Sequence, residues 1–113
     1  MSFETEIKDY EDAATGELLS IAELQFSLVS RDTLHHSELS PGDLVRVNEL
    51  DRAFIERAEE VRDFIAGYGD ADAIFVEKPP QFWWWHIARI ASGQMLVDLV
   101  HRTVKYKEIE YKY

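Results

Sequence analysis

The chain has 113 residues, with 22 Asp or Glu against 12 Lys or Arg and a formal net charge of −10 at pH 7. This length predicts one domain over residues 1–113, and 46% hydrophobic residues are enough for a core. The absence of cysteine excludes disulfides, thiolate metal sites and cysteine nucleophiles, and favours a reducing, cytoplasmic setting. No apolar run approaches a membrane span, and the first residues lack the basic-then-apolar pattern of a secretion signal.

The negative charge is unevenly distributed along the chain. Residues 1–80 contain nineteen acids and seven bases, whereas residues 81–113 contain three acids and five bases. An acidic balance of this size disfavours direct binding to nucleic acid or to an anionic membrane. It favours either simple solubility or an acidic face that binds a basic protein surface.

The first segment carries a helical pattern. Apolar residues recur at steps of three or four, which predicts an amphipathic helix over residues 3–29, broken or kinked at Gly16. The alternative is a β-hairpin that pairs residues 3–12 with residues 18–30. Residues 30–40 lack periodicity and predict a loop.

A second helix begins with a strong start signal. Ser40 is a typical N-cap and Pro41 suits the first helical position, so we expect a helix over residues 41–66, closed by Gly67. The alternative makes residues 43–47 a short strand and starts the helix later.

The last third is harder to assign. Residues 67–80 read as an irregular connector in which residues 73–76 form a short strand or a buried loop, and the prolines after it start a helix over residues 81–102. The tail, residues 103–113, is a helical extension, an edge strand or a loose end, and its tyrosines favour the strand. We therefore predict an all-α fold, a small bundle of three to four helices. The alternative is α+β with an N-terminal hairpin and a C-terminal strand.

The most unusual string runs from Phe82 to His86 and contains three consecutive tryptophans. Consecutive side chains of an α-helix point about 100° apart, so three adjacent indoles cannot all face one core. We predict that Trp85 lies with Leu96 on a partner or self-association surface, since exposed tryptophans are enriched at binding hot spots. The alternatives are a helix buried on nearly all sides and an aromatic ligand pocket. The predicted interaction residues combine this helix with an acidic face: Phe82, Trp84, Trp85, Arg89, Leu96, Glu56, Glu59 and Glu60.

Arg31 and His36 are separated by four residues, with the polar Asp32 directly after the arginine. This spacing resembles the Arg-polar-x-x-x-His signature of HEPN ribonucleases, which are helical domains of about this length. In that family the arginine and the histidine act near the scissile phosphate without a metal. The resemblance implies a small helical ribonuclease or hydrolase with Arg31 and His36 as its catalytic candidates.

Two acid–imidazole pairs stand three residues apart: Asp32 with His35, and Asp98 with His101. A metal site needs three or four converging ligands, so no metal is predicted. We expect Asp98 to fix His101 by a hydrogen bond instead. Phosphate-binding loops and dinucleotide fingerprints are missing from the sequence, and no cofactor is expected.

The leading functional hypothesis is a non-catalytic acidic interaction module: a subunit, regulator or inhibitor that binds a basic partner protein through the acidic face and the tryptophan-bearing helix. A homodimer is a further expectation, because residues 82–96 carry surplus apolar surface. The alternatives are the HEPN-like enzyme and a ligand-binding bundle with a tryptophan-lined pocket.

Overall fold

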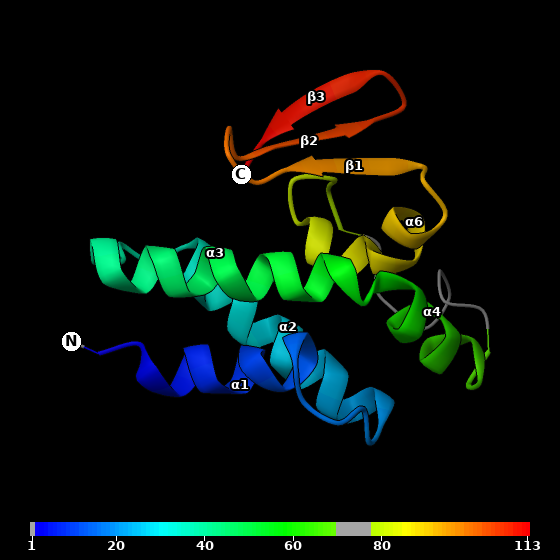
Figure 1. Ribbon diagram of the computed structural model, residues 1–113, viewed down its shortest axis with the longest axis horizontal. Coiled ribbons are helices and arrows are strands. Elements are labelled where there is room, and N and C mark those ends of the chain that lie inside the picture. Colours follow the sequence, from blue (N-terminus) through cyan, green and yellow to red (C-terminus); the bar gives the residue numbers. More distant parts are fainter. Residues whose placement is uncertain (1, 70–77) are drawn as a thin grey trace. The chain divides into compact units, whose positions relative to one another are not determined.

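The computed structural model describes residues 2–69 and 78–113. These residues form helices and a three-stranded antiparallel sheet, so the fold is mixed α+β (Figure 1). The all-α prediction is wrong, and the α+β alternative fits better. The chain groups into two compact units, Met1–Phe54 and Ile55–Tyr113. A single domain stays a prediction.

Three helices build the first unit: α1 (Glu4–Ala14), α2 (Ile21–His35) and α3 (Pro41–Glu56), whose last two residues belong to the second unit. Helices α1 and α2 pack against each other. The core of this unit is made of buried side chains from all three helices: Ile7, Tyr10, Leu24, Leu28, Val47 and Phe54.

The break at Gly16 is confirmed. The N–H of Gly16 donates to the carbonyl oxygen of Asp12 at 3.0 Å as the chain leaves α1. A Cβ at position 16 would lie 2.8 Å from that oxygen and 2.9 Å from the Asp12 Cα, which is too close for any other residue. Because helices flank the break on both sides, the N-terminal hairpin is wrong.

Helix α2 runs further than the pattern predicted. It begins at the N-cap Ser20, whose Oγ accepts the N–H of Glu23 at 3.1 Å, and it continues to His35. The loop predicted over residues 30–40 is therefore wrong in its first half. The buried face of α2 continues through polar residues, notably Arg31. Because these residues are not apolar, the helical pattern of apolar residues does not extend over them.

The predicted start of the next helix is confirmed. Ser40 Oγ accepts the N–H of Asp43 at 3.2 Å, and Pro41 is the first helical residue. The strand alternative over residues 43–47 is therefore wrong. The helix does not run unbroken to residue 66, because a turn at Arg57 separates α3 from the next helix.

The second unit contains short elements: α4 (Ala58–Ala66), the 3₁₀-helix η1 (Trp83–His86), α6 (Ile87–Ala91), and the strands β1 (Met95–Asp98), β2 (Thr103–Tyr106) and β3 (Ile109–Lys112). Helix α4 ends at Gly67 in right-handed backbone, rather than at a left-handed glycine. Helices α4 and α6 pack together, and the sheet order is β1-β2-β3.

The helix predicted over residues 81–102 is wrong over most of its length. Gly93, with φ +81°, ends the helical backbone after α6, and an antiparallel sheet follows in place of a resumed helix. Met95 pairs with Tyr106 in this sheet, and Thr103 pairs with Lys112. The strand expected in the tail is confirmed as β3.

The strand or buried loop expected over residues 73–76 lies outside the described residues. Across the two described ranges, no helix has the length and apolar character needed to cross a membrane.

Candidate functional site

The predicted exposure of Trp85 is wrong, since only 8% of this residue is accessible. All four residues of η1 are buried, and the ammonium of Lys78 lies 5.2 Å from the centre of the Trp85 ring. Phe82, which is half-buried, and Trp83 both pack edge-on against Trp84, at 5.7 and 5.6 Å between ring centres. The alternative, in which this segment is buried on nearly all sides, therefore fits all three indoles.

Arg89 and Leu96 do not form a shared surface with Trp85. One guanidinium nitrogen of Arg89 donates to His86 Nδ1 at 3.0 Å, and the group lies 5.2 Å from the centre of the Tyr106 ring. His86 Nε2 then donates to a backbone carbonyl at 2.7 Å. Of Trp85, Arg89 and Leu96, only Leu96, which lies on β1, is strongly exposed, at 63%.

The acidic face predicted from Glu56, Glu59 and Glu60 is exposed, but it is not uniformly negative. The Glu60 carboxylate accepts two hydrogen bonds from Arg57, at 3.0 and 3.2 Å. These bonds, reinforced by the charge of the guanidinium, lower the pKa of Glu60. Arg57 therefore neutralises part of the negative charge that would attract a basic partner.

Arg31 and His36 are not brought together as a catalytic pair. Arg31 is 1% exposed, and its Nε and Nη2 each donate to the Asp51 carboxylate at 3.0 Å. The Tyr10 hydroxyl donates to the same carboxylate at 2.7 Å. His36, in contrast, is exposed at the C-cap of α2. The arginine is therefore part of a buried polar network that joins α1, α2 and α3.

Asp98 fixes His101, as predicted, although in a loop between strands and not on a helix. Its Oδ2 lies 2.8 Å from His101 Nδ1, while its Oδ1 accepts the N–H groups of Val100 and His101 at 3.0 Å each. These hydrogen bonds lower the pKa of Asp98. In the part of the chain that the structure describes, no group of three potential metal ligands occurs.

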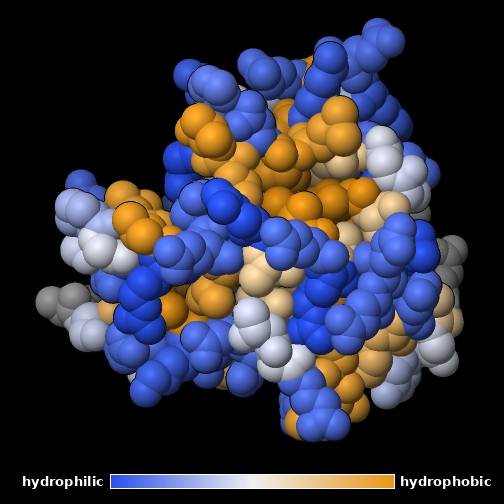
Figure 2. All heavy atoms as spheres, viewed as in Figure 1, coloured by the Kyte–Doolittle hydropathy of each residue, from blue (hydrophilic) through white to orange (hydrophobic). Residues whose placement is uncertain are grey.

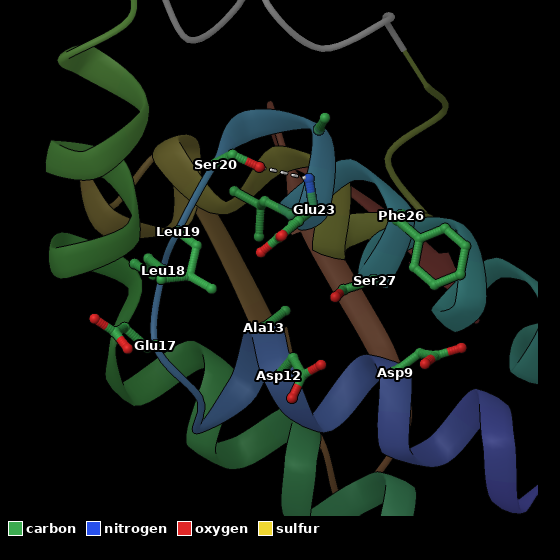
Figure 3. A pocket seen from close by; sticks show the side chains of 12 residues that line it. Asp9, Asp12, Ala13, Glu17, Leu18, Leu19, Ser20, Glu23, Phe26 and Ser27 are labelled. Carbon is green, nitrogen blue, oxygen red and sulfur yellow. Dashed lines mark hydrogen bonds between the residues drawn. The ribbon is translucent and has the colours of Figure 1, made fainter.

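A cleft of about 540 Å³ lies between α1 and α2 in the first unit (Figure 3). Four acidic residues line it: Asp9 and Asp12 from α1, Glu17 from the connector, and Glu23 from the first turn of α2. No basic side chain is part of the described lining, and no ion pair engages these four carboxylates within the described residues. The cleft is therefore an uncompensated region of negative charge.

Apolar side chains border the same cleft. Leu19 and Phe26 line it and are 59% and 62% exposed, and Val29, one turn beyond Phe26 on α2, is 52% exposed. We call Leu19, Phe26 and Val29 the exposed apolar stripe. On the face drawn in Figure 2, hydrophobic side chains reach the surface in patches between hydrophilic ones.

The sequence contains a signal for this site that lies outside the core-facing row of apolar residues. In helical projection Phe26 and Val29 lie away from the buried Leu24 and Leu28, so α2 carries apolar residues on two faces. Large apolar residues outside the core-facing stripe indicate a second contact surface.

Comparisons of the chain with protein-family models, with curated proteins and with solved structures found no match. The function is therefore inferred from the site alone.

Proposed function

We propose that this protein is a non-catalytic acidic interaction module that binds a basic partner protein through its first unit. The observation that carries the proposal is the exposed apolar stripe, whose three side chains are each more than half accessible. The unit that bears it, residues 1–54, contains twelve acids and only four bases. Apolar anchors surrounded by a polar rim are the usual composition of a protein-binding site.

The two components have different roles in binding. Clustered carboxylates attract a basic partner over long range and raise its association rate, an effect that salt weakens. A large side chain such as Phe26 loses its contact with water on binding and slows dissociation. Phe26 thus takes the anchor role that the sequence had suggested for Trp85. The absence of cysteine supports a cytoplasmic setting.

The test is chemical cross-linking followed by affinity capture from lysate of the source cells, with Phe26→Ser compared with wild type. The matched control is Tyr68→Ser, since Tyr68 is an aromatic residue of similar exposure, 58%, in the second unit. We expect a basic protein that wild type and the control capture, that Phe26→Ser loses, and that added salt weakens.

Equal capture by all three proteins would contradict the proposal. So would an enzymatic activity: if wild type cleaves single-stranded RNA and His36→Ala does not, the protein is a nuclease and not a binding module. The burial of Arg31 against Asp51 leads us to expect no such difference.

A further inference from the structure

We infer that the cleft between α1 and α2 is a docking site for a lysine side chain, together with a neighbouring apolar residue, of a partner protein. This inference rests on the proposed function and assigns its binding site and the chemistry of its partner. Three features of the cleft carry it: its uncompensated charge, the hydroxyl of Ser27 directed into it, and its apolar border.

The charge of the cleft favours a cation as its ligand. Its four carboxylates come from three successive pieces of chain, and no lysine or arginine lines the described part of the cleft. Carboxylates that line one cleft together attract a cation more strongly than a single carboxylate does. The four acids on their own explain attraction but not a specific ligand.

Ser27 supplies the independent indication of a ligand. It is only 4% exposed and lines the cleft, and Figure 3 shows its hydroxyl directed into the space between α1 and α2. No hydrogen bond from the described residues engages this hydroxyl, and because it lines the cleft it stays open to a ligand. An ammonium group entering the cleft would donate a hydrogen bond to this hydroxyl.

The apolar border suits the rest of the ligand. Leu18, Leu19 and Phe26 line the cleft beside the carboxylates, so the aliphatic stem of a lysine can pack against them. The volume, about 540 Å³, falls within the range of about 300–1,000 Å³ that is typical of ligand sites. It exceeds what one lysine side chain fills and leaves room for an adjacent apolar residue.

The arrangement favours lysine over arginine. A guanidinium is bound best by a carboxylate that meets its planar fork with two parallel hydrogen bonds. Here the acceptors approach from different elements: Asp12 on α1, Glu23 and the Ser27 hydroxyl on α2 (Figure 3). An ammonium, which donates three hydrogen bonds in different directions, is the better match.

The test is a titration of the full chain with a labelled short peptide in which lysine alternates with leucine. Three further peptides separate the contributions: arginine in place of lysine, uncharged norleucine in place of lysine, and serine in place of leucine. Binding is measured by fluorescence anisotropy at low and high salt, and the contact residues are mapped from amide shifts in NMR spectra. We expect the lysine–leucine peptide to bind most tightly and to shift the amides of Ser27 and Leu19.

Variants with the same change in net charge locate the site. Asp12→Asn with Glu23→Gln removes two carboxylates from the cleft, while Glu56→Gln with Glu59→Gln removes two exposed carboxylates from α3 and α4. We expect the cleft pair to weaken binding about tenfold, which corresponds to about 1.4 kcal/mol. The control pair should weaken it less than twofold, and Ser27→Ala should weaken it severalfold.

The outcomes separate the site from the function. If the control pair weakens peptide binding as much as the cleft pair, the protein binds basic segments elsewhere, and the cleft assignment fails while the proposed function stands. Failure of the lysine–leucine peptide to bind wild type at low salt also overturns the cleft assignment, whereas the proposed function is judged by the capture experiment. A free polyamine that binds as tightly as the peptide would make the cleft a small-amine site and overturn the protein partner.

Discussion

The buried network of Tyr10, Arg31 and Asp51 ties the three helices of the first unit together. Each partner comes from a different helix, and all three are at most 1% exposed. The Asp51 carboxylate accepts three hydrogen bonds, two from the guanidinium and one from the phenol. Such a network fixes the relative register of its helices, because any sliding would leave a buried charge without its partner.

Removal of the central carboxylate should be severely destabilising. Asp51→Ala leaves the Arg31 guanidinium buried without its counter-ion, and breaking a buried pair in this way costs about 3–5 kcal/mol of unfolding free energy. The control is Glu4→Ala, which breaks the exposed ion pair with Arg46 at 2.7 Å and should cost far less, because solvent screens that pair. Urea denaturation measures both, and equal losses would contradict the role assigned to the network.

Tyr10 should make the folded protein less stable at alkaline pH. Burial, followed by the nearby Asp51 carboxylate, raises the pKa of Tyr10 well above its ordinary value of 10.0. The unfolded chain releases this proton near pH 10 while the folded chain retains it. The stability is therefore complete below pH 10 and falls above it, by about 1.4 kcal/mol per pH unit for one proton.

Denaturation curves between pH 9 and 12 test this effect on the wild type and on Tyr10→Phe. Because phenylalanine has no proton to release, the variant should lose stability less steeply above pH 10, although it is less stable at neutral pH. Tyrosinate absorbance should show one of the five tyrosines ionising only as the protein unfolds. Parallel slopes for the two proteins would be inconsistent with a retained Tyr10 proton.

At the scale of the elements, Gly16 and Gly42 should respond in opposite ways to alanine. A Cβ at position 16 would meet the Asp12 backbone at 2.8 Å, so Gly16→Ala should destabilise by about 1–2 kcal/mol. At Gly42, in the first turn of α3, a Cβ would meet nothing within 4 Å, and Gly42→Ala should stabilise by about 0.5–1 kcal/mol. Thermal melts of both variants check the signs, and a loss of stability at both positions would refute the contrast.

The turn between β2 and β3 stores strain. Its two residues, Lys107 and Glu108, have φ of +52° and +65°, the left-handed backbone of a type I′ hairpin, in which Asn-Gly is preferred. Lys107→Asn with Glu108→Gly should therefore stabilise the protein by about 1–2 kcal/mol.

The same substitutions within the strands provide the control for this turn. Lys105 and Glu110 are cross-strand partners, and Lys105→Asn with Glu110→Gly should destabilise because Asn and Gly are poor strand residues. Calorimetry compares the two double variants. Turn strain would be ruled out as the cause if the substitutions in the strands also stabilised the protein, or if the substitutions in the turn did not stabilise it.

At the scale of the whole molecule, charge should oppose self-association. A homodimer was expected because of surplus apolar surface around Trp85. This residue is buried, so that reason no longer holds. The remaining apolar stripe lies in a unit with twelve acids and four bases, so two copies that meet there bring like charges together. We expect a monomer at low ionic strength, with any association increasing as salt screens the repulsion.

Sedimentation velocity at several salt concentrations measures this directly, with Phe26→Ser as the variant that removes the stripe's largest side chain. A stable dimer at low salt that this substitution leaves intact would show that the protein self-associates through another surface. Dissociation of the dimer by added salt would show that its interface is built on opposite charges instead.

Several features were predictable from the sequence because their causes are local. The capping serine and proline at Ser40 and Pro41, and the break at Gly16, depend on residues within one helical turn. The strand in the tail follows from tyrosine and β-branched side chains, which suit extended backbone. The net acidity, and the classes of partner it disfavours, likewise need only composition.

The tertiary structure alone decided the features that depend on distant contacts. Burial of Trp85 requires neighbours around η1 that no helical projection contains, and Arg31 meets Asp51 twenty residues away. The sheet after Gly93 forms because each strand finds a paired neighbour, a condition that short apolar runs do not reveal. The cleft exists because the break at Gly16 returns α2 along α1, which brings separated carboxylates and Ser27 to one place. Sequence determined which side chains were available, while the packing of the helices decided which of them face a ligand.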